Sequence, residues 1–185
     1  MRPKKRERRR AKTTVREATS ADLLKMLSQN GHVPAGFFDP KERDVVLFPG
    51  ADDSVREHEM YHSEQSGLFG LRADRKNRRT ARKISNMMDQ QVYDDLDKDG
   101  FSPLMYMIDD PLEFEAIVRS AMNSPEAKDV DFDQSFDEIS EDLNAIPREE
   151  TNTNIRLLRT AMTEGSLNKR QKELFLKALR ANLRP

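Results

Sequence analysis

Two histidines and a glutamate in the segment His58-Glu59-Met60-Tyr61-His62 are the residues of this chain whose types and spacing could do chemistry. In a helix, His58 and His62 stand four positions apart on one face, about one turn from each other. Two imidazoles placed in that way can bind one Zn²⁺ ion at about 2.0–2.1 Å each. Glu59 borders the same face and can reach a metal-bound water, whose pKa the metal lowers towards about 7, without being a ligand. The HExxH pattern therefore predicts a hydrolytic zinc site, with His58 and His62 as ligands and Glu59 as general base.

The residues before the motif predict a small β-hairpin followed by the helix that carries the motif. Residues 35–38 and 44–48 have the composition of strands, and Asp and Pro in the connection 39–43 favour a turn. Ser54 and Glu57 form the pattern of a capping box, which predicts a helix that runs to about Gln65. Together with helical patterns later in the chain, these elements predict an α+β fold that is mostly helical, with the hairpin packed on the active-site helix.

The order of a hairpin, a strand and an HExxH helix resembles that of the zincin metallopeptidases. Residues 36–66, followed by the segment Pro111-Leu112-Glu113-Phe114-Glu115-Ala116, resemble small zincin-like peptidases of the Glu-ligand type that many bacteriophage genomes encode. The resemblance covers residues 31–120, and its specific part is short. It implies that a Glu on a downstream helix, often in an ExxA setting, is the third zinc ligand. That position maps onto Glu113, which has Ala116 three residues later, with Glu115 as the fallback.

Other interpretations of these residues stay open at the level of sequence. Glu113 also completes a capping box with Asp110, in which its carboxylate would accept from the Asp110 backbone amide. A third histidine ligand in the HExxHxxGxxH manner is excluded, because Gln65 and Leu68 occupy the positions that this pattern requires. The remaining histidine, His32, precedes the hairpin and is expected to be an ordinary loop or surface residue.

The resemblance also implies where a substrate would bind. In zincins, a strand with a free edge beside the active-site helix binds an extended peptide antiparallel through backbone hydrogen bonds. Val45, Val46 and Leu47 are the candidates here, although the same residues fit a strand that serves only the core. Such chemistry also needs a donor for the oxyanion. Tyr106 is the candidate, and the other two tyrosines, at 93 and 61, are alternatives.

Charge is strongly segregated along a chain whose formal net charge is only −1. Residues 1–16 contain nine Lys or Arg and one Glu, and residues 72–83 are also basic. We expect a basic, disordered arm over residues 1–18, a zincin-like domain over 19–122, an acidic linker over 123–150 and C-terminal helices over 151–185. The arm could contact nucleic acid through phosphates, or it could pair with the chain's own acidic stretch.

A second pattern looks like part of a calcium site. Asp95-Leu96-Asp97-Lys98-Asp99-Gly100 copies the first half of an EF-hand loop, including the glycine at its sharp turn. The twelve-residue numbering then places Tyr106 where the bidentate Glu belongs, so an acidic turn is the better interpretation. Residues 129–133 lack the glycine as well and are weaker still.

Composition excludes several classes of function. The chain has 185 residues and no Cys, which excludes disulfides, thiol catalysis and zinc sites built on sulfur. The longest apolar run, residues 104–108, is far shorter than a membrane span, and no apolar segment follows the basic N-terminus. We therefore expect a cytoplasmic protein without a membrane partner, and the resemblance to phage-encoded peptidases implies the host cytoplasm or a virion.

Three functions remain as hypotheses. The first is zinc-dependent hydrolysis of peptide bonds in a peptide or protein substrate. The second is a non-catalytic structural or assembly protein of a phage particle with a zincin-like fold, which would contact other phage structural proteins. The third is a nucleic-acid-binding protein that acts through the basic residues of segment 1–16.

Overall fold

The structure is a computed structural model, and it describes residues 12–30, 33–65, 79, 83, 102–163 and 167–182. These residues form a mixed α+β fold that is mostly helical, as expected. The strands are β1 (Thr14–Glu17), β2 (Gly36–Asp39) and β3 (Asp44–Leu47). The helices are α1 (Ser20–Asn30), α2 (Asp53–Gln65), α5 (Pro103–Asp109), α6 (Pro111–Met122), α7 (Phe136–Ala145), α8 (Thr153–Thr163) and α9 (Lys169–Asn182), with short 3₁₀ turns at Pro125–Ala127 and Arg148–Glu150.

The three strands form one small sheet in the order β1-β3-β2. The expected hairpin is present, because β2 pairs antiparallel with β3. Strand β1 pairs parallel with the other side of β3, so the prediction that residues 1–18 form a disordered arm is wrong for residues 14–17. Arg16 explains how a basic segment joins the sheet: its guanidinium forms ion pairs with Asp22 at 2.8 Å and with Asp44 at 3.2 Å.

The prediction that Val45, Val46 and Leu47 offer a free strand edge is also wrong. They belong to β3, which is the central strand and is paired on both sides. Val45 and Val46 are fully buried, so they serve the core. In the described part of the chain, the strand with an unpaired side next to α2 is β2.

Gly36 allows β2 to lie close to α2. A Cβ atom at this position would stand 2.9 Å from Cγ1 of Val55 on α2 and 3.2 Å from the carbonyl oxygen of Val46. A distance of 2.9 Å is too short for two carbon atoms in contact. The missing side chain therefore sets the spacing between the edge strand and the helix that carries the HExxH motif.

The main core lies among the helices that follow residue 102. Helices α5, α6, α8 and α9 contribute to it, with Leu104, Met107, Ile117, Leu158 and Phe175 fully buried. The acidic segment 123–150 is not a linker, because Phe136, Ile139 and Leu143 of α7 are buried in the same core. Helix α7 begins with a capping box between Ser135 and Glu138. The C-terminal helices expected over 151–185 appear as α8 and α9, and they share this core with α5 and α6.

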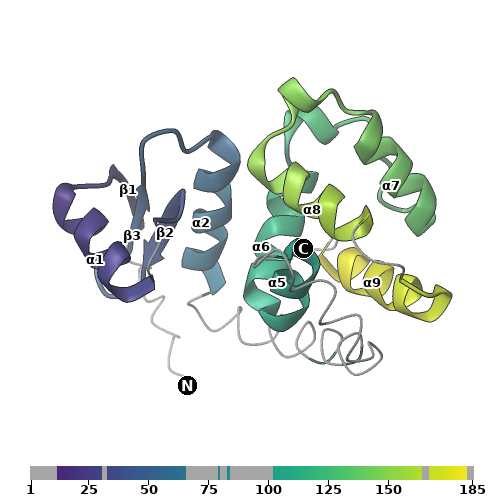
Figure 1. The fold of residues 1–185 in the computed structure, drawn as a ribbon, viewed down its shortest axis with the longest axis horizontal. Helices are drawn as coiled ribbons and strands as arrows, with labels where there is room; N and C mark the ends of the chain where they lie inside the picture. Colours follow the sequence, from purple (N-terminus) through teal and green to yellow (C-terminus); the bar gives the residue numbers. More distant parts are fainter. Residues whose placement is uncertain are drawn as a thin grey trace, which may run out of the picture.

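Helix α2 lies between the sheet and the helical part of the molecule, where it packs on β2 and β3 on one side and on α6 and α8 on the other (Figure 1). The helix is capped by Asp52, whose carboxylate accepts from the Val55 backbone N–H at 3.0 Å. This corrects the expected capping box at Ser54, which lies inside the helix and is buried.

Several sequence predictions fall outside the described residues: His32, Tyr93 and the EF-hand-like segment 95–100. The basic residues of segment 72–83 also fall outside them, apart from Arg79 and Lys83. Among the residues that the structure describes, no helix combines the length and the apolar character needed to cross a membrane.

Candidate metal centre

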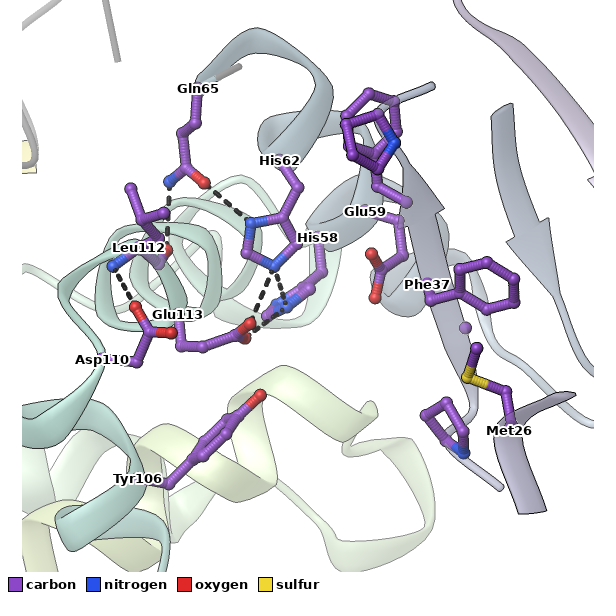
Figure 2. A pocket seen from close by; sticks show the side chains of 14 residues that line it. Met26, Phe37, His58, Glu59, His62, Gln65, Tyr106, Asp110, Leu112 and Glu113 are labelled. Carbon is purple, nitrogen blue, oxygen red and sulfur yellow. Dashed lines mark hydrogen bonds and ion pairs between the residues drawn. The ribbon is translucent and has the colours of Figure 1, made fainter. Parts of the chain in front are cut away.

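The HExxH motif lies on α2, as predicted, and faces a cavity of about 500 Å³. The wall of the cavity opposite the motif comes from α5 and α6, and β2 and Met26 of α1 form the remaining side (Figure 2). His58, Glu59 and His62 each place one possible ligand atom within 4.8 Å of the others, so this group could hold a metal ion. His58 and Glu59 are buried, and His62 is partly exposed.

Glu113 of α6 joins the two histidines, as Figure 2 shows. Its carboxylate Oε2 lies 2.9 Å from Nε2 of His58, and Oε1 lies 3.2 Å from Nε2 of His62. The two Nε2 atoms are 3.0 Å apart. Ligand atoms at about 2.0–2.2 Å from one tetrahedral zinc ion lie roughly 3–4 Å from each other. The three distances stand at the short end of that range, so the donor set fits a single small cation.

The electrostatics of this cluster favour a positive charge at its centre. Burial lowers the pKa of His62, but hydrogen bonding and charge from Glu113 outweigh burial and raise it to about 9. Burial conversely raises the pKa of Glu113, and the hydrogen bonds from His58 and His62 hold it well below its usual range. Without a metal, the raised pKa keeps a proton on His62 at neutral pH. A divalent cation with affinity for imidazole and carboxylate would replace that proton and satisfy all three groups.

The geometry distinguishes the two contacts that the sequence allows for Glu113, with the Asp110 backbone amide or with the histidines. The Asp110 side chain caps α6 through the Leu112 N–H at 2.9 Å, as predicted, but the Asp110 N–H donates to the carbonyl of Tyr106. The Glu113 carboxylate therefore does not form the capping box and faces the histidines. Glu115, the fallback ligand, instead forms an ion pair with Arg119 at 3.1 Å and accepts a hydrogen bond from Gln65 at 3.2 Å.

Glu59 lies in the cavity next to the two histidines and makes a different contact (Figure 2). Burial raises the pKa of its carboxyl group, and this effect exceeds the opposing influence of His58 and His62. The backbone N–H of Phe38 on β2 donates a hydrogen bond to it. A buried carboxylate with a raised pKa is a stronger proton acceptor than a solvated one, which suits a general base beside a cation site.

Tyr106 is the sequence candidate for the oxyanion donor, and the structure brings it to the cavity. It comes from α5 and its hydroxyl points towards Glu113 (Figure 2). Burial raises its pKa far above the usual range, and its hydrogen bond to the Glu113 carboxylate acts in the same direction. The phenol is therefore a proton donor at neutral pH. Tyr61, one of its alternatives, lies elsewhere, with its ring under the Arg119 guanidinium.

Three parts of the site were missed at the level of sequence. Gln65 contacts His62, and Gly36 and Phe38 of β2 line the cavity. The sequence predicts Gln65 as the end of the motif helix and as a residue that excludes a third histidine ligand, and its spacing of three from His62 on one helix is a further, usable signal. The role of β2 carried no such signal, because it depends on β1 occupying the other side of β3.

No family model, curated protein or solved structure matches this chain. The functional evidence is therefore the arrangement of the side chains around the cavity.

Proposed function

We propose that this protein is a zinc-dependent peptidase that hydrolyses peptide bonds with an activated water. The observation that supports the proposal most strongly is the convergence of Nε2 of His58, Nε2 of His62 and the Glu113 carboxylate within 3.2 Å of each other. The buried carboxylate of Glu59 stands beside them, with a ligand atom within 4.8 Å of one on each ring. Two imidazoles and one carboxylate, with a further position left for water, are the ligands of known catalytic zinc sites.

His58, His62 and Glu113 would hold the ion, and Glu59 would not. Glu113 contacts both imidazoles directly, whereas Glu59 accepts from the Phe38 N–H. When bound, zinc would supply Lewis acidity towards water and towards the carbonyl of the scissile bond. Glu59 would accept a proton from the attacking water and deliver it to the nitrogen of the leaving amine. Its raised pKa suits both transfers.

Tyr106 would stabilise the charge that develops on the carbonyl oxygen. Its hydroxyl keeps its proton at neutral pH and points into the cavity from the wall opposite α2. A preorganised donor of this kind acts most strongly in a site from which water is excluded. In the substrate-free protein, Glu113 accepts this hydrogen bond, so a substrate would compete with Glu113 for the hydroxyl.

The edge of β2, rather than β3, would bind the substrate backbone. Phe37 pairs with Val46, and the carbonyl of Ala35 accepts from Phe48, so alternate residues of β2 face β3. In an antiparallel ladder the residues between them direct both N–H and C=O to the other side. Gly36 and Phe38 therefore present polar backbone groups towards the cavity, which agrees with the hydrogen bond from Phe38 to Glu59. An extended peptide could add to this edge.

Cleavage by the Glu59→Gln variant tests the proposal. The full chain and the variant, both loaded with zinc, are incubated with a mixed peptide library, and new termini are detected by mass spectrometry. We expect zinc-dependent cleavage that falls by about 10²–10⁴-fold in the variant, while the zinc content stays the same. Glu64→Gln, an exposed change on the same helix, should leave the rate unchanged. A wild-type protein that binds zinc and cleaves nothing would instead support a non-catalytic, structural role.

A further inference from the structure

Gln65, the last residue of α2, connects one histidine to the helix that carries the third ligand (Figure 2). Its Oε1 lies 2.7 Å from Nδ1 of His62. Its Nε2 donates to the carbonyl of Leu112 at 3.0 Å and to the carboxylate of Glu115 at 3.2 Å. On α6, Leu112 directly precedes Glu113, and Glu115 follows it by two positions. One side chain thus contacts three positions around the cluster.

The partners of Gln65 fix which way its amide points. A backbone carbonyl can only accept a hydrogen bond, and the Glu115 carboxylate is an acceptor held in an ion pair with Arg119 at 3.1 Å. The NH₂ group of Gln65 must therefore face these two oxygens, which leaves its Oε1 to face His62. An oxygen at 2.7 Å from Nδ1 requires that Nδ1 carry the hydrogen. The lone pair of the neutral His62 ring then lies on Nε2, the atom next to Glu113 and His58.

His58 provides a comparison within the same site. Its Nδ1 is buried and has no hydrogen-bond partner among the described residues. Both rings contact Glu113 through Nε2, so the two histidines differ at Nδ1. The Nδ1 atom of His58 is enclosed by packing alone, whereas the Nδ1 atom of His62 is held by the Gln65 amide.

We propose that Gln65 is a positioning residue that holds His62 in the Nδ1–H tautomer and directs its Nε2 towards the metal, with Glu115 and Arg119 fixing the Gln65 amide in turn. This inference rests on the proposed zinc site. It assigns a role to Glu115 that differs from the ligand role considered for it. Outer partners of this kind commonly change metal affinity by about 10–100-fold when they are removed.

The first experiment measures zinc affinity by competition with a chromophoric chelator in the full chain. Gln65→Met removes both hydrogen-bonding groups at similar volume, and Glu64→Met is the matched control at an exposed neighbouring position. We expect affinity to fall by about 10–100-fold in Gln65→Met and to stay within about twofold in Glu64→Met. Equal affinity in Gln65→Met and the wild type would overturn the inference. No zinc binding by the wild type would instead contradict the proposed function.

A second measurement needs no variant and does not depend on whether Gln65→Met folds. Long-range ¹H–¹⁵N correlation spectra of the zinc-loaded wild type report which nitrogen of each ring carries a proton. We expect His62 to show a protonated Nδ1 and a metal-bound Nε2. A His62 ring bound through Nδ1, with its proton on Nε2, would contradict the inference even if zinc binds tightly.

Discussion

The two ends of α2 are held against the helical part of the molecule by two separate sets of hydrogen bonds. At its N-terminal end, the buried Ser54 backbone carbonyl accepts hydrogen bonds from Asn154 of α8 at 2.7 Å and from Ser120 of α6 at 2.9 Å. At its C-terminal end, the amide of Gln65 bridges His62 and α6. We call these groups the N-terminal anchor (Asp52, Ser54, Ser120, Thr153 and Asn154) and the C-terminal anchor (Gln65, Leu112 and Glu115).

The two anchors differ in whether they contact the candidate metal site, so they should contribute differently to stability and to metal binding. Three residues of the N-terminal anchor, Ser54, Ser120 and Asn154, are buried, and none of the five lines the cavity. The C-terminal anchor lies at the cavity and contacts a proposed ligand directly. Changes in the N-terminal anchor should therefore lower the free energy of unfolding, and changes in the C-terminal anchor should lower metal affinity.

Asn154→Ala should have the largest effect on stability. Asn154 is 2% exposed, and its amide donates to the Ser54 carbonyl and to Oγ of Ser120. Its removal leaves a cavity, and two buried oxygens each lose a hydrogen bond. We therefore expect a loss of about 2–4 kcal/mol in the free energy of unfolding. Urea denaturation measures this loss, with the exposed Thr160→Ala on the same helix as control. The zinc affinity of the folded variant should stay within about threefold of the wild type. A much larger fall would contradict the claim that only the C-terminal anchor affects metal affinity.

Gly36→Ala tests the side of α2 that faces the sheet. The added Cβ would stand 2.9 Å from Cγ1 of Val55, so β2 and α2 must move apart. We expect a loss of about 1–3 kcal/mol in the free energy of unfolding. Peptidase activity should fall further than stability explains, because the Phe38 N–H would shift relative to Glu59. A double-mutant cycle with Val55→Ala measures the contact, and additive effects would show that the two positions do not interact.

Asp52→Asn tests the N-terminal anchor through pH. Burial opposes ionisation of Asp52, but hydrogen bonds from Ser54, Thr153 and the Val55 N–H outweigh it, so its pKa in the folded state is lowered. A carboxyl group whose folded pKa lies below the unfolded value of about 3.9 stabilises the fold above that value. This stabilisation is lost as the pH falls from about 5 through the folded pKa. Both oxygens of Asp52 accept hydrogen bonds, so in Asp52→Asn an NH₂ group faces a donor and the negative charge at the helix start is lost. We expect this change to cost about 1–2 kcal/mol at pH 7.

The control for this prediction is the pH dependence itself. The difference in unfolding free energy between the wild type and Asp52→Asn should shrink as the pH is lowered from 6 towards 3, because the unfolded wild-type chain takes up a proton at Asp52 before the folded protein does. Other acid-sensitive pairs, such as Arg16 with Asp22, remain in both proteins and cancel in the difference. A difference that does not change over this range would show that the charge of Asp52 does not stabilise the fold.

The sequence was sufficient to predict the face of α2 that forms the candidate site. Helical spacing alone brings His58 and His62 together, and the predicted N-cap at Asp110 begins α6 as expected. The prediction that Glu113 is the third ligand depends on the family resemblance. The spacing alone does not support it, because the local pattern also fits a capping box with Asp110. Only the packing of α6 against α2 turns this carboxylate towards the histidines.

Helix α7 and strand β1 could not be predicted from the sequence. Each lies in a segment with a strong excess of one charge, and strand β1 also depends on contacts between residues distant in sequence. The acidic segment 123–150 has the composition of a linker, yet Phe136, Ile139 and Leu143 form an apolar stripe with helical spacing and are buried. The basic segment near residue 16 becomes a strand because Asp22 and Asp44 pair with Arg16. That strand makes β3 central and leaves the edge to β2.

The central claim is that His58, His62 and Glu113 hold one zinc ion and that Glu115 does not. Metal analysis of the full chain after dialysis against a fixed concentration of free zinc that saturates the wild-type site tests it most directly. The comparison is between the wild type, Glu113→Gln and Glu115→Gln. We predict about one zinc per chain in the wild type, a loss of most of it in Glu113→Gln, and retention in Glu115→Gln at saturating zinc. A wild-type protein without zinc, or equal zinc in the wild type and in Glu113→Gln, would contradict the account.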